Sequence, residues 1–350
     1  MSIAHVFFNK NEDPNKFVPQ YCSMIKKEFG FSEHRFLYMG DKINNGDFDS
    51  EYCGCTFQDV YRLSNIIKGY DKIIFHSTPH KTLILYFAFL FWFRKKLHLK
   101  MYLSLWGGEI HHRSSTLKSR IRDLFLKKFM SYFSGFITYL GEDYDLAKRF
   151  SGAKAKHVNL GGFYPSNVVP SAITPARSNT TKILVGSSAL ERNKHMSIID
   201  ILKKRLPKER DITIFIPLSY GDPLYAEKVK NYAMNHLEHY NVECLFELME
   251  FSDYIAFLAS MDIAIFAHEG QQGMGNIRNL LGAGSSVYLN ASSISYRYLS
   301  HLGFTVGDFK DFKFEKVINH RNMKLAKSHF SLESTLNKQS EFFSVESHRY

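Results

Sequence analysis

The chain has 350 residues, 45% of them hydrophobic and 23% charged, which is the composition of a folded protein and enough length for two hydrophobic cores. Its formal net charge of +11 indicates an anionic partner, such as membrane phosphates, nucleic acid or a pyrophosphate group. The four cysteines include no CxxC pair, so we expect neither a zinc site nor a disulfide framework, but the reduced thiols of a cytosolic protein.

The N-terminal segment MSIAHVFFNKNEDP has no basic region before its apolar residues, so we expect a first strand here and no secretory signal peptide. The longest apolar run, LILYFAFLFWF at residues 83–93, has about half the length that a bilayer-spanning helix needs. We therefore expect no transmembrane helix.

Much of the positive charge follows directly after this apolar run. Residues 94–128 contain ten Lys and Arg and only two acidic residues. An apolar surface bordered by positive charge is typical of a protein that lies on an anionic membrane, although a buried helix followed by a solvated charged loop would give the same pattern. The residues that we expect to face a membrane or a membrane-bound acceptor are Trp92, Arg94, Lys95, Lys96, Trp106 and Arg113.

Short apolar segments alternate with helical patterns along the chain, which predicts parallel sheets covered on both faces by helices. In the first half the predicted strands are IAHVFF, RFLYMG, KIIFH, MYLSLW and GFITYL. In the second half they are KILVG, ITIFIP, ECLFEL, DIAIFA and SVYLN, with helices over residues 196–204, 225–236 and 254–260. The fold class is therefore α/β with doubly wound, Rossmann-like sheets.

The alternation is interrupted at residues 161–181, a stretch rich in Pro, Ser, Thr and Gly that is typical of a linker. We accordingly expect one domain over residues 1–165, a second over 166–325, and a C-terminal helix or tail over 326–350. Two such domains would face each other across a cleft at the carboxyl ends of their strands, where open α/β sheets bind ligands.

Two glycine-containing turns follow strands of the second domain. After KILVG comes SSALERNKH, in which Asn193 is expected to cap a helix that starts near Lys194. After DIAIFA comes HEGQQGMGN, where the glycines allow close approach of the backbone to a ligand and a helix is expected over residues 276–283, ended by Gly284. A helix N-terminus suits a phosphate, but an ordinary strand-to-helix turn would also fit the first stretch.

Several short motifs carry a resemblance to a known family. They are FH at residues 75–76, LWGGE at 105–109, VGSS-x4-NKH at 185–195, IP-x2-Y at 216–220, EF-x2-Y-x3-L-x3-D at 250–262, and QQGMG before a helix that ends in AG. In this order they resemble the 4-α-L-fucosyltransferase family, glycosyltransferase family 56, over about residues 70 to 290. The residues that we expect to bind the donor are Gly186, Ser187, Ser188, Arg192, Asn193, His195, Tyr220, Gln271, Gln272, Gly273, Gly275 and Asn276, of which Ser187 and Arg192 depart from the family pattern.

The resemblance implies a GT-B architecture, with the nucleotide-sugar donor bound mainly by the second domain and the acceptor by the first. It implies inverting transfer of a deoxy-aminosugar of the Fuc4NAc type from a TDP-linked donor, without a metal or other cofactor. The acceptor would be a polyprenyl-diphosphate-linked saccharide of surface polysaccharide or O-antigen synthesis, at the cytoplasmic face of the bacterial plasma membrane. Nucleic acid is not an expected partner, because no zinc finger, RRM or helix-turn-helix signature is present.

An acceptor hydroxyl needs a general base, and two residues near strand ends are candidates. Glu109 follows MYLSLW and stands where the family has an aspartate, although it could instead pair with Arg113. His76 ends KIIFH and has a suitable intrinsic pKa, although a histidine there could simply be a hydrogen-bonded core residue. His111 and His112 remain further candidates.

Two other functions fit parts of the sequence. A non-hydrolysing nucleotide-sugar epimerase would share the two-domain plan but would not need the basic aromatic segment. A non-catalytic protein bound to the membrane surface would explain that segment without using the glycine turns.

Overall fold

The computed structural model describes residues 1–8, 17–30, 32–40, 50–79, 82–106, 117–208 and 211–344. It contains two compact units, one formed by residues 1–166 together with residues from Thr335 onward, the other by residues 167–334. The stretch that we predicted as a separate tail is therefore divided between them. Helix α13 (His320–Phe330) belongs to the second unit, and most of α14 (Leu332–Ser344) belongs to the first.

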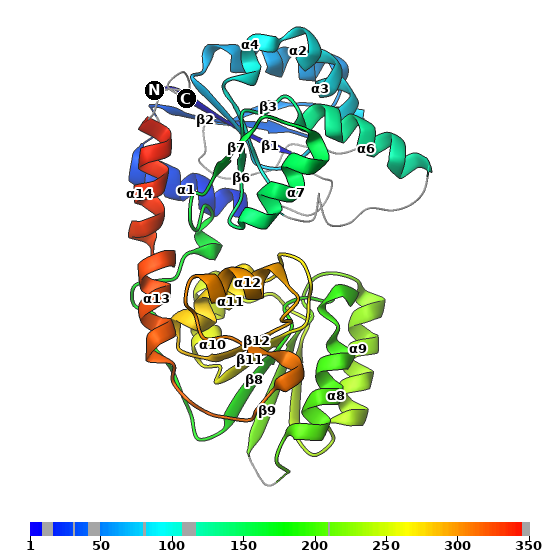
Figure 1. Ribbon diagram of the computed structural model, residues 1–350, viewed down its shortest axis with the longest axis vertical. Helices are drawn as coiled ribbons and strands as arrows, with labels where there is room; N and C mark the ends of the chain where they lie inside the picture. The colour runs from blue at the N-terminus through cyan, green and yellow to red at the C-terminus, as the bar shows by residue number, and fades with distance from the viewer. Residues whose placement is uncertain are drawn as a thin grey trace. The chain divides into compact units, whose positions relative to one another are not determined.

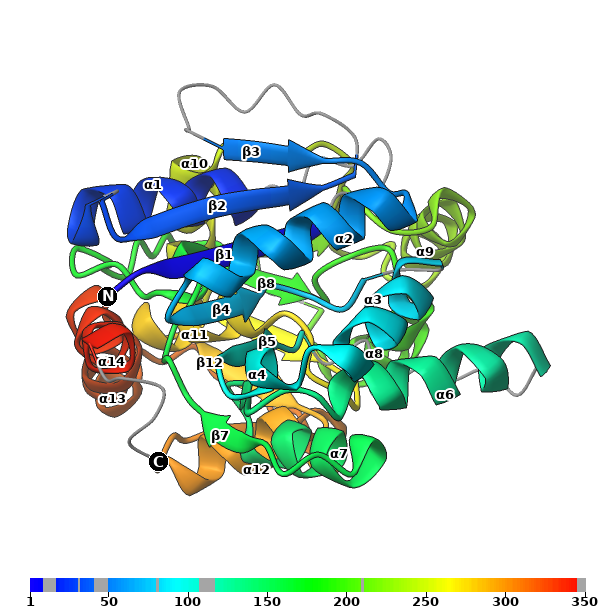
Figure 2. The same ribbon diagram turned by 90° about the horizontal axis from the view of Figure 1, so that it is seen from above.

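The first unit is built on a parallel sheet of seven strands in the order β3-β2-β1-β4-β5-β6-β7, and Figure 2 lets the reader follow β3, β2, β1, β4 and β5 across the view. The strands are β1 (Ile3–Phe8), β2 (His34–Met39), β3 (Ser50–Cys53), β4 (Lys72–Phe75), β5 (Met101–Ser104), β6 (Gly135–Ile137) and β7 (Lys156–Val158). The order reverses between β1 and β4, the kind of switch point where doubly wound sheets bind ligands.

Helices cover both faces of this sheet because its strands are apolar on both sides. Ala4 and Val6 pack into one core and Ile3 and Phe7 into the other, as the two-residue repeat of a strand requires. The helices of the first unit are α1 (Phe17–Phe29), α2 (Phe57–Ile66), α3 (Thr82–Phe93), α4 (Lys95–His98), α6 (Leu117–Met130), α7 (Gly141–Ser151) and the greater part of α14.

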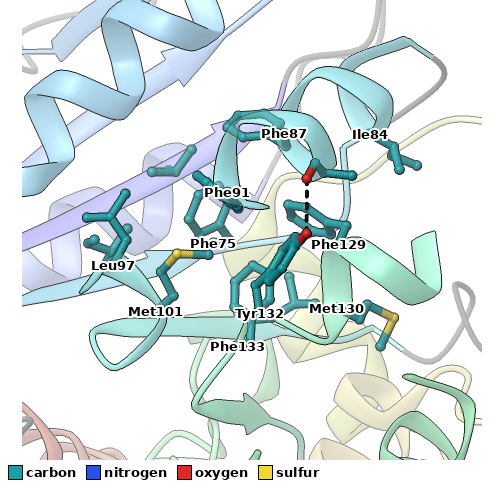
Figure 3. Close-up of a cluster of buried hydrophobic side chains, with 14 of the residues drawn as sticks. Phe75, Ile84, Phe87, Phe91, Leu97, Met101, Phe129, Met130, Tyr132 and Phe133 are labelled. Atoms are coloured by element: carbon teal, nitrogen blue, oxygen red, sulfur yellow. Dashed lines mark hydrogen bonds between the residues drawn. The ribbon is translucent and has the colours of Figure 1, made fainter. Parts of the chain in front are cut away.

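The core under α3 and α6 is rich in aromatic side chains (Figure 3). Phe75 of β4 makes edge-to-face contacts with Phe87 of α3 and with Phe133, at ring distances of 5.8 and 5.3 Å, and the Tyr132 hydroxyl donates to the Ala88 carbonyl at 3.2 Å. Each fully buried aromatic side chain contributes about 2–3 kcal/mol. The apolar run at residues 83–93 is thus largely a core helix, and among the described residues no helix has the length and apolar character needed to cross a membrane.

The last helix of the chain docks on the opposite face of the first unit. Phe343 packs edge-on against His34 with ring centroids 4.9 Å apart. The buried Lys72 ammonium donates to the Phe342 carbonyl in the last turn of α14, where a cation complements the helix dipole. Burial lowers the pKa of Lys72 to about 8.

The second unit contains a parallel sheet of six strands in the order β10-β9-β8-β11-β12-β13. The strands are β8 (Thr181–Val185), β9 (Ile212–Pro217), β10 (Asn241–Leu245), β11 (Ile263–Phe266), β12 (Ser286–Leu289) and β13 (Gly307–Asp308). Helices α8 (His195–Arg205) and α9 (Pro223–His236) cover one face, and α10 (Phe251–Ala259), α11 (Met274–Gly282), α12 (Ile294–His301) and α13 lie on the other (Figure 1). The predicted α/β, doubly wound class is confirmed.

Asp262 holds the start of β11 against β8. Its buried carboxylate accepts a hydrogen bond from the Lys182 backbone N–H at 2.9 Å and lies 3.4 Å from Arg177 and 3.5 Å from Lys316. These partners indicate a structural role for the buried Asp262 carboxylate.

Candidate functional site

Three loops meet at the carboxyl edge of the second sheet, after β8, β9 and β11. The Ala189 N–H donates to the Tyr220 carbonyl at 2.8 Å, and the Asp222 N–H donates to the Ala189 carbonyl at 2.8 Å, which joins the first two loops. A Cβ atom added to Gly273 would lie 3.2 Å from Ser187 Oγ, so the first and third loops are also in contact. The two glycine turns identified in the sequence therefore lie side by side.

Gly186 is required at the start of the first loop for two reasons. Its φ of +69° lies in the left-handed region, which side chains other than glycine rarely adopt. An added Cβ would lie 2.5 Å from His195 Nε2. The imidazole thus packs directly against the backbone of the turn.

The predicted capping role of Asn193 is wrong. The N-cap of α8 is Lys194, with φ 53° and ψ 42° and no side-chain capping hydrogen bond, because a short 3-10 turn at Glu191–Asn193 precedes the helix. The Asn193 amide instead donates to the Ser188 carbonyl at 2.8 Å and to Ser188 Oγ at 3.0 Å. It closes the loop on itself and leaves the first N–H groups of α8 without a side-chain acceptor.

The N-terminus of α11 has the same property. Its N-cap is Gly273, with φ 59° and ψ 20° and no side-chain capping bond. The helix begins at Met274, two residues earlier than predicted, so Gly275 lies in its first turn. Gly284 has φ +73° just beyond the end of the helix, as expected for a C-terminal glycine.

Amide side chains line this second turn. The Asn276 amide donates to the Tyr254 hydroxyl at 2.8 Å, which ties α11 to α10. The Oε1 atoms of Gln271 and Gln272 are buried and have no hydrogen-bond partner among the residues that the structure describes. Buried polar atoms are normally paired, so these two amides are free to bind a ligand.

Positive charge stands beside the two turns. Partial burial raises the pKa of the Tyr220 phenol while the charge of Arg192 lowers it. Burial, and to a smaller extent the charge of Arg192, lowers the pKa of His268 to about 4. The charge of Arg192 therefore acts on both side chains. Lys194 Nζ pairs with Glu269 Oε1 at 2.5 Å, across the first and third loops.

Two buried histidines, His195 and His268, lie at these loops. Only His195 was predicted from the sequence. Burial lowers the pKa of His195 to about 4, and its Nδ1 lies 3.2 Å from the hydroxyl of the buried Tyr225. His268 directly follows the apolar segment DIAIFA. His76 was a candidate because it stands at the end of a predicted strand. The same criterion identifies His268.

His76 lies inside a chain of buried hydrogen bonds in the first unit. Its Nε2 is 3.0 Å from His5 Nδ1, His5 Nε2 is 2.9 Å from His34 Nδ1, and His76 Nδ1 is 2.5 Å from the Tyr164 hydroxyl. The side chain is only 3% exposed, and burial lowers its pKa well below the ordinary value. The Trp106 indole N–H donates to the His76 carbonyl at 2.7 Å. Because both ring nitrogens are engaged, the geometry favours a positioning role for His76.

The other candidate bases, Glu109, His111 and His112, lie outside the described residues, as does Arg113. Trp106 is the last described residue before them, and its ring packs against Tyr164 at 4.6 Å. These assignments remain predictions.

A surface of mixed apolar and basic character covers the outer side of α3 and α6. Trp92 is 58% and Phe93 71% exposed, and Lys128 Nζ lies 4.3 Å above the Trp92 ring, which joins the two helices. Arg94 is held by the protein, because it stacks on Tyr61 and donates to Asn65 Oδ1 at 2.9 Å. We call this the α3–α6 surface; its exposed residues are Phe89, Trp92, Phe93, Lys95, Lys96, Ile121, Leu124, Phe125 and Lys127.

Solved structures of similar fold are glycosyltransferases and related sugar-nucleotide enzymes. α,α-Trehalose 6-phosphate synthase from Burkholderia multivorans superimposes with a TM-score of 0.65 at 9% identity, over 98% of this chain and 98% of that one. The lipopolysaccharide outer core galactosyltransferase WaaB superimposes with a TM-score of 0.64 at 12% identity, over 97% of this chain and 98% of that one. UDP-GlcNAc 2-epimerase from Neisseria meningitidis superimposes with a TM-score of 0.55 at 12% identity, over 97% of this chain and 99% of that one. The fold is therefore that of the GT-B glycosyltransferases.

Residues 68–329 match the family described as 4-alpha-L-fucosyltransferase glycosyl transferase group 56. The match covers more than half of the chain and includes both glycine turns, so the chain belongs to this family and is a glycosyltransferase. It accordingly acts on a nucleotide-sugar donor and an acceptor.

Proposed function

We propose that this glycosyltransferase moves a deoxy-aminosugar, of the Fuc4NAc type, from a TDP-linked donor to a polyprenyl-diphosphate-linked saccharide, with inversion, in surface polysaccharide or O-antigen synthesis. The observation that carries the proposal is the meeting of two helix N-termini without side-chain caps, those of α8 and α11, at one edge of the second sheet. Free N–H groups at helix N-termini bind phosphate.

The leaving nucleoside diphosphate gains negative charge as the sugar–oxygen bond breaks. Donors fixed before the reaction stabilise such charge without the cost of reorganisation. The N–H groups of both helices and the guanidinium of Arg192 are the donors proposed here, while the unpaired Oε1 atoms of Gln271 and Gln272 can accept hydrogen bonds from hydroxyl or N–H groups of the sugar.

The acceptor hydroxyl attacks from the opposite face of the sugar and gives its proton to a base. We assign this base to Glu109, three residues after Trp106. His76 would act through others, since it holds the Trp106 indole through its carbonyl and Tyr164 through its ring. His111 and His112 are the alternatives if Glu109 proves dispensable.

The α3–α6 surface is proposed to rest on the inner face of the bacterial plasma membrane, where the lipid-linked acceptor lies. Ile121, Leu124, Phe125 and Lys128 follow the i, i+3, i+4, i+7 spacing of one helical face, and the first three are exposed. Exposed aromatic rings beside lysines suit the boundary between anionic headgroups and acyl chains.

Sedimentation with vesicles tests the membrane proposal. Replacing Trp92 and Phe93 by serine should reduce binding to vesicles of anionic phospholipid several-fold. Leu224→Ser, at an even more exposed apolar position of the second unit, should leave it unchanged. Equal binding of both variants and the wild type would refute the docking surface.

Calorimetric titration with TDP, UDP, GDP and ADP in the presence of EDTA tests the donor. Tight binding of TDP alone supports the proposal, while preference for another nucleotide changes the donor but keeps the transferase. Product analysis then separates transfer from epimerisation, because an epimerase would convert the sugar nucleotide with no acceptor present. Absence of binding by every nucleotide would overturn the proposed site.

A further inference from the structure

His268 is a buried side chain with an unused hydrogen-bonding atom. The residue is only 1% exposed, and its Nδ1 has no partner among the described residues. Leaving a buried polar atom unpaired costs about 1–3 kcal/mol. This cost is removed when a bound ligand supplies the missing hydrogen-bond partner.

The position of His268 identifies the ligand group. It stands immediately beyond β11, five residues before Gly273, the N-cap of α11. The guanidinium of Arg192 lies near enough to affect its titration, and the adjacent Glu269 is neutralised by Lys194 at 2.5 Å. His268 therefore lies in the loop that ends at the N-cap of α11 and that pairs through Glu269 with Lys194, the N-cap of α8, which are surroundings that favour an anion.

We propose that His268 binds the diphosphate of the nucleotide-sugar donor through Nδ1 and that donor binding shifts the ring toward its protonated form, with uptake of up to one proton from solvent. This inference rests on the proposed function. In the free protein the ring is neutral near pH 7, because burial and Arg192 both disfavour its charged form. A diphosphate at hydrogen-bonding distance favours the charged form, and the imidazolium then donates its Nδ1–H to a phosphate oxygen.

The proton has a use in the reaction. When the bond from the sugar carbon to the phosphate oxygen breaks, its electron pair stays on the leaving diphosphate, and the acceptor's proton goes to the base on the other side. The imidazolium keeps its own proton and strengthens its hydrogen bond to the more highly charged leaving group. After the nucleotide departs, the ring returns the proton to solvent.

Calorimetry at pH 6.0 in two buffers of different ionisation enthalpy counts the protons taken up. The probe is TDP-glucose, whose diphosphate has no group that titrates near pH 6. Wild-type protein should take up a fraction of a proton per ligand and bind about fourfold more tightly at pH 6.0 than at pH 7.5, if the pKa of the bound imidazole returns to its ordinary value of about 6.5.

The variants are His268→Asn, which keeps a hydrogen-bonding group near the position of Nδ1 but cannot titrate, and His157→Gln as the control, at a histidine of the first unit whose pKa burial also lowers. His268→Asn should bind at pH 7.5 within a few-fold of wild type and show neither proton uptake nor pH dependence, while His157→Gln keeps both. Circular dichroism confirms that each variant is folded. Binding without uptake by the wild type, or uptake that persists in His268→Asn, would overturn the inference while leaving the proposed function intact. If the wild type binds no nucleotide, the proposed function fails first.

Discussion

Acidification should destabilise the first unit through its chain of buried histidines. His5, His34 and His76 are all buried, and burial is the largest cause that lowers the pKa of each. An unfolded histidine titrates near pH 6.5, so below that pH the unfolded chain binds more protons than the folded one. Stability is therefore complete above about pH 6.5 and is lost as the pH falls toward the folded pKa values.

The magnitude follows from the pKa of His34, which burial lowers to about 4. At pH 5 this single residue removes about 2 kcal/mol of unfolding free energy. Burial lowers the pKa of His5 and of His76 in the same direction, so both add to this loss. The whole stability of many domains is about 5–15 kcal/mol, so the loss from His34 alone is a substantial part of it.

The protein contains two tryptophans, Trp92 and Trp106, and both lie in the first unit. Tryptophan fluorescence during urea unfolding therefore reports on that unit alone. The urea midpoint should fall clearly between pH 7.5 and pH 5.0. In His34→Gln the same pH change should cost about 2 kcal/mol less than in wild type, although the variant is less stable at pH 7.5. An equal loss in both proteins, or no loss in either, would refute the reasoning.

Three other changes have defined outcomes. Gly186→Ala should destabilise the second unit by about 2 kcal/mol or more, since it combines a left-handed backbone with a steric clash. Thermal unfolding followed by circular dichroism measures this loss. The control is Gly69→Ala, where an added Cβ meets nothing within 4 Å. Asp262→Ala should cost about 3–5 kcal/mol, because Arg177 and Lys316 lose their buried partner, and a variant as stable as wild type would contradict that role. His76→Phe should lower kcat without changing the KM for the nucleotide sugar, and an unchanged kcat in a folded variant would refute its positioning role.

Much of the local structure was predictable from the sequence. Every apolar segment assigned as a strand forms one, though ECLFEL begins two residues too late compared with β10, whose first residue Asn241 is polar and exposed and whose second residue Val242 is partly buried. The glycines at 186, 273 and 284 stand at left-handed positions. Strand periodicity and glycine conformation depend on neighbours in the chain, so the sequence reports them directly.

Side-chain roles in the site were less predictable. Asn193 has the residue type of an N-cap, yet the 3-10 turn before α8 places it beside Ser188. The position of His268 after an apolar segment marks it as a strand-end residue, but its unpaired Nδ1 is visible only when the surrounding described residues are known. Both depend on contacts between loops that follow different strands.

The sequence by itself determined that this protein has two doubly wound sheets, glycine turns at strand ends and an apolar helix followed by basic residues, because composition and period encode these features over a few residues at a time. Only the tertiary structure decided that His5, His34 and His76 join in one buried chain. They lie up to 71 positions apart, and the parallel register of β2, β1 and β4 brings them together. Register is set by packing across the whole sheet, which is why the accessibility and charge of these rings could not be read from any one segment.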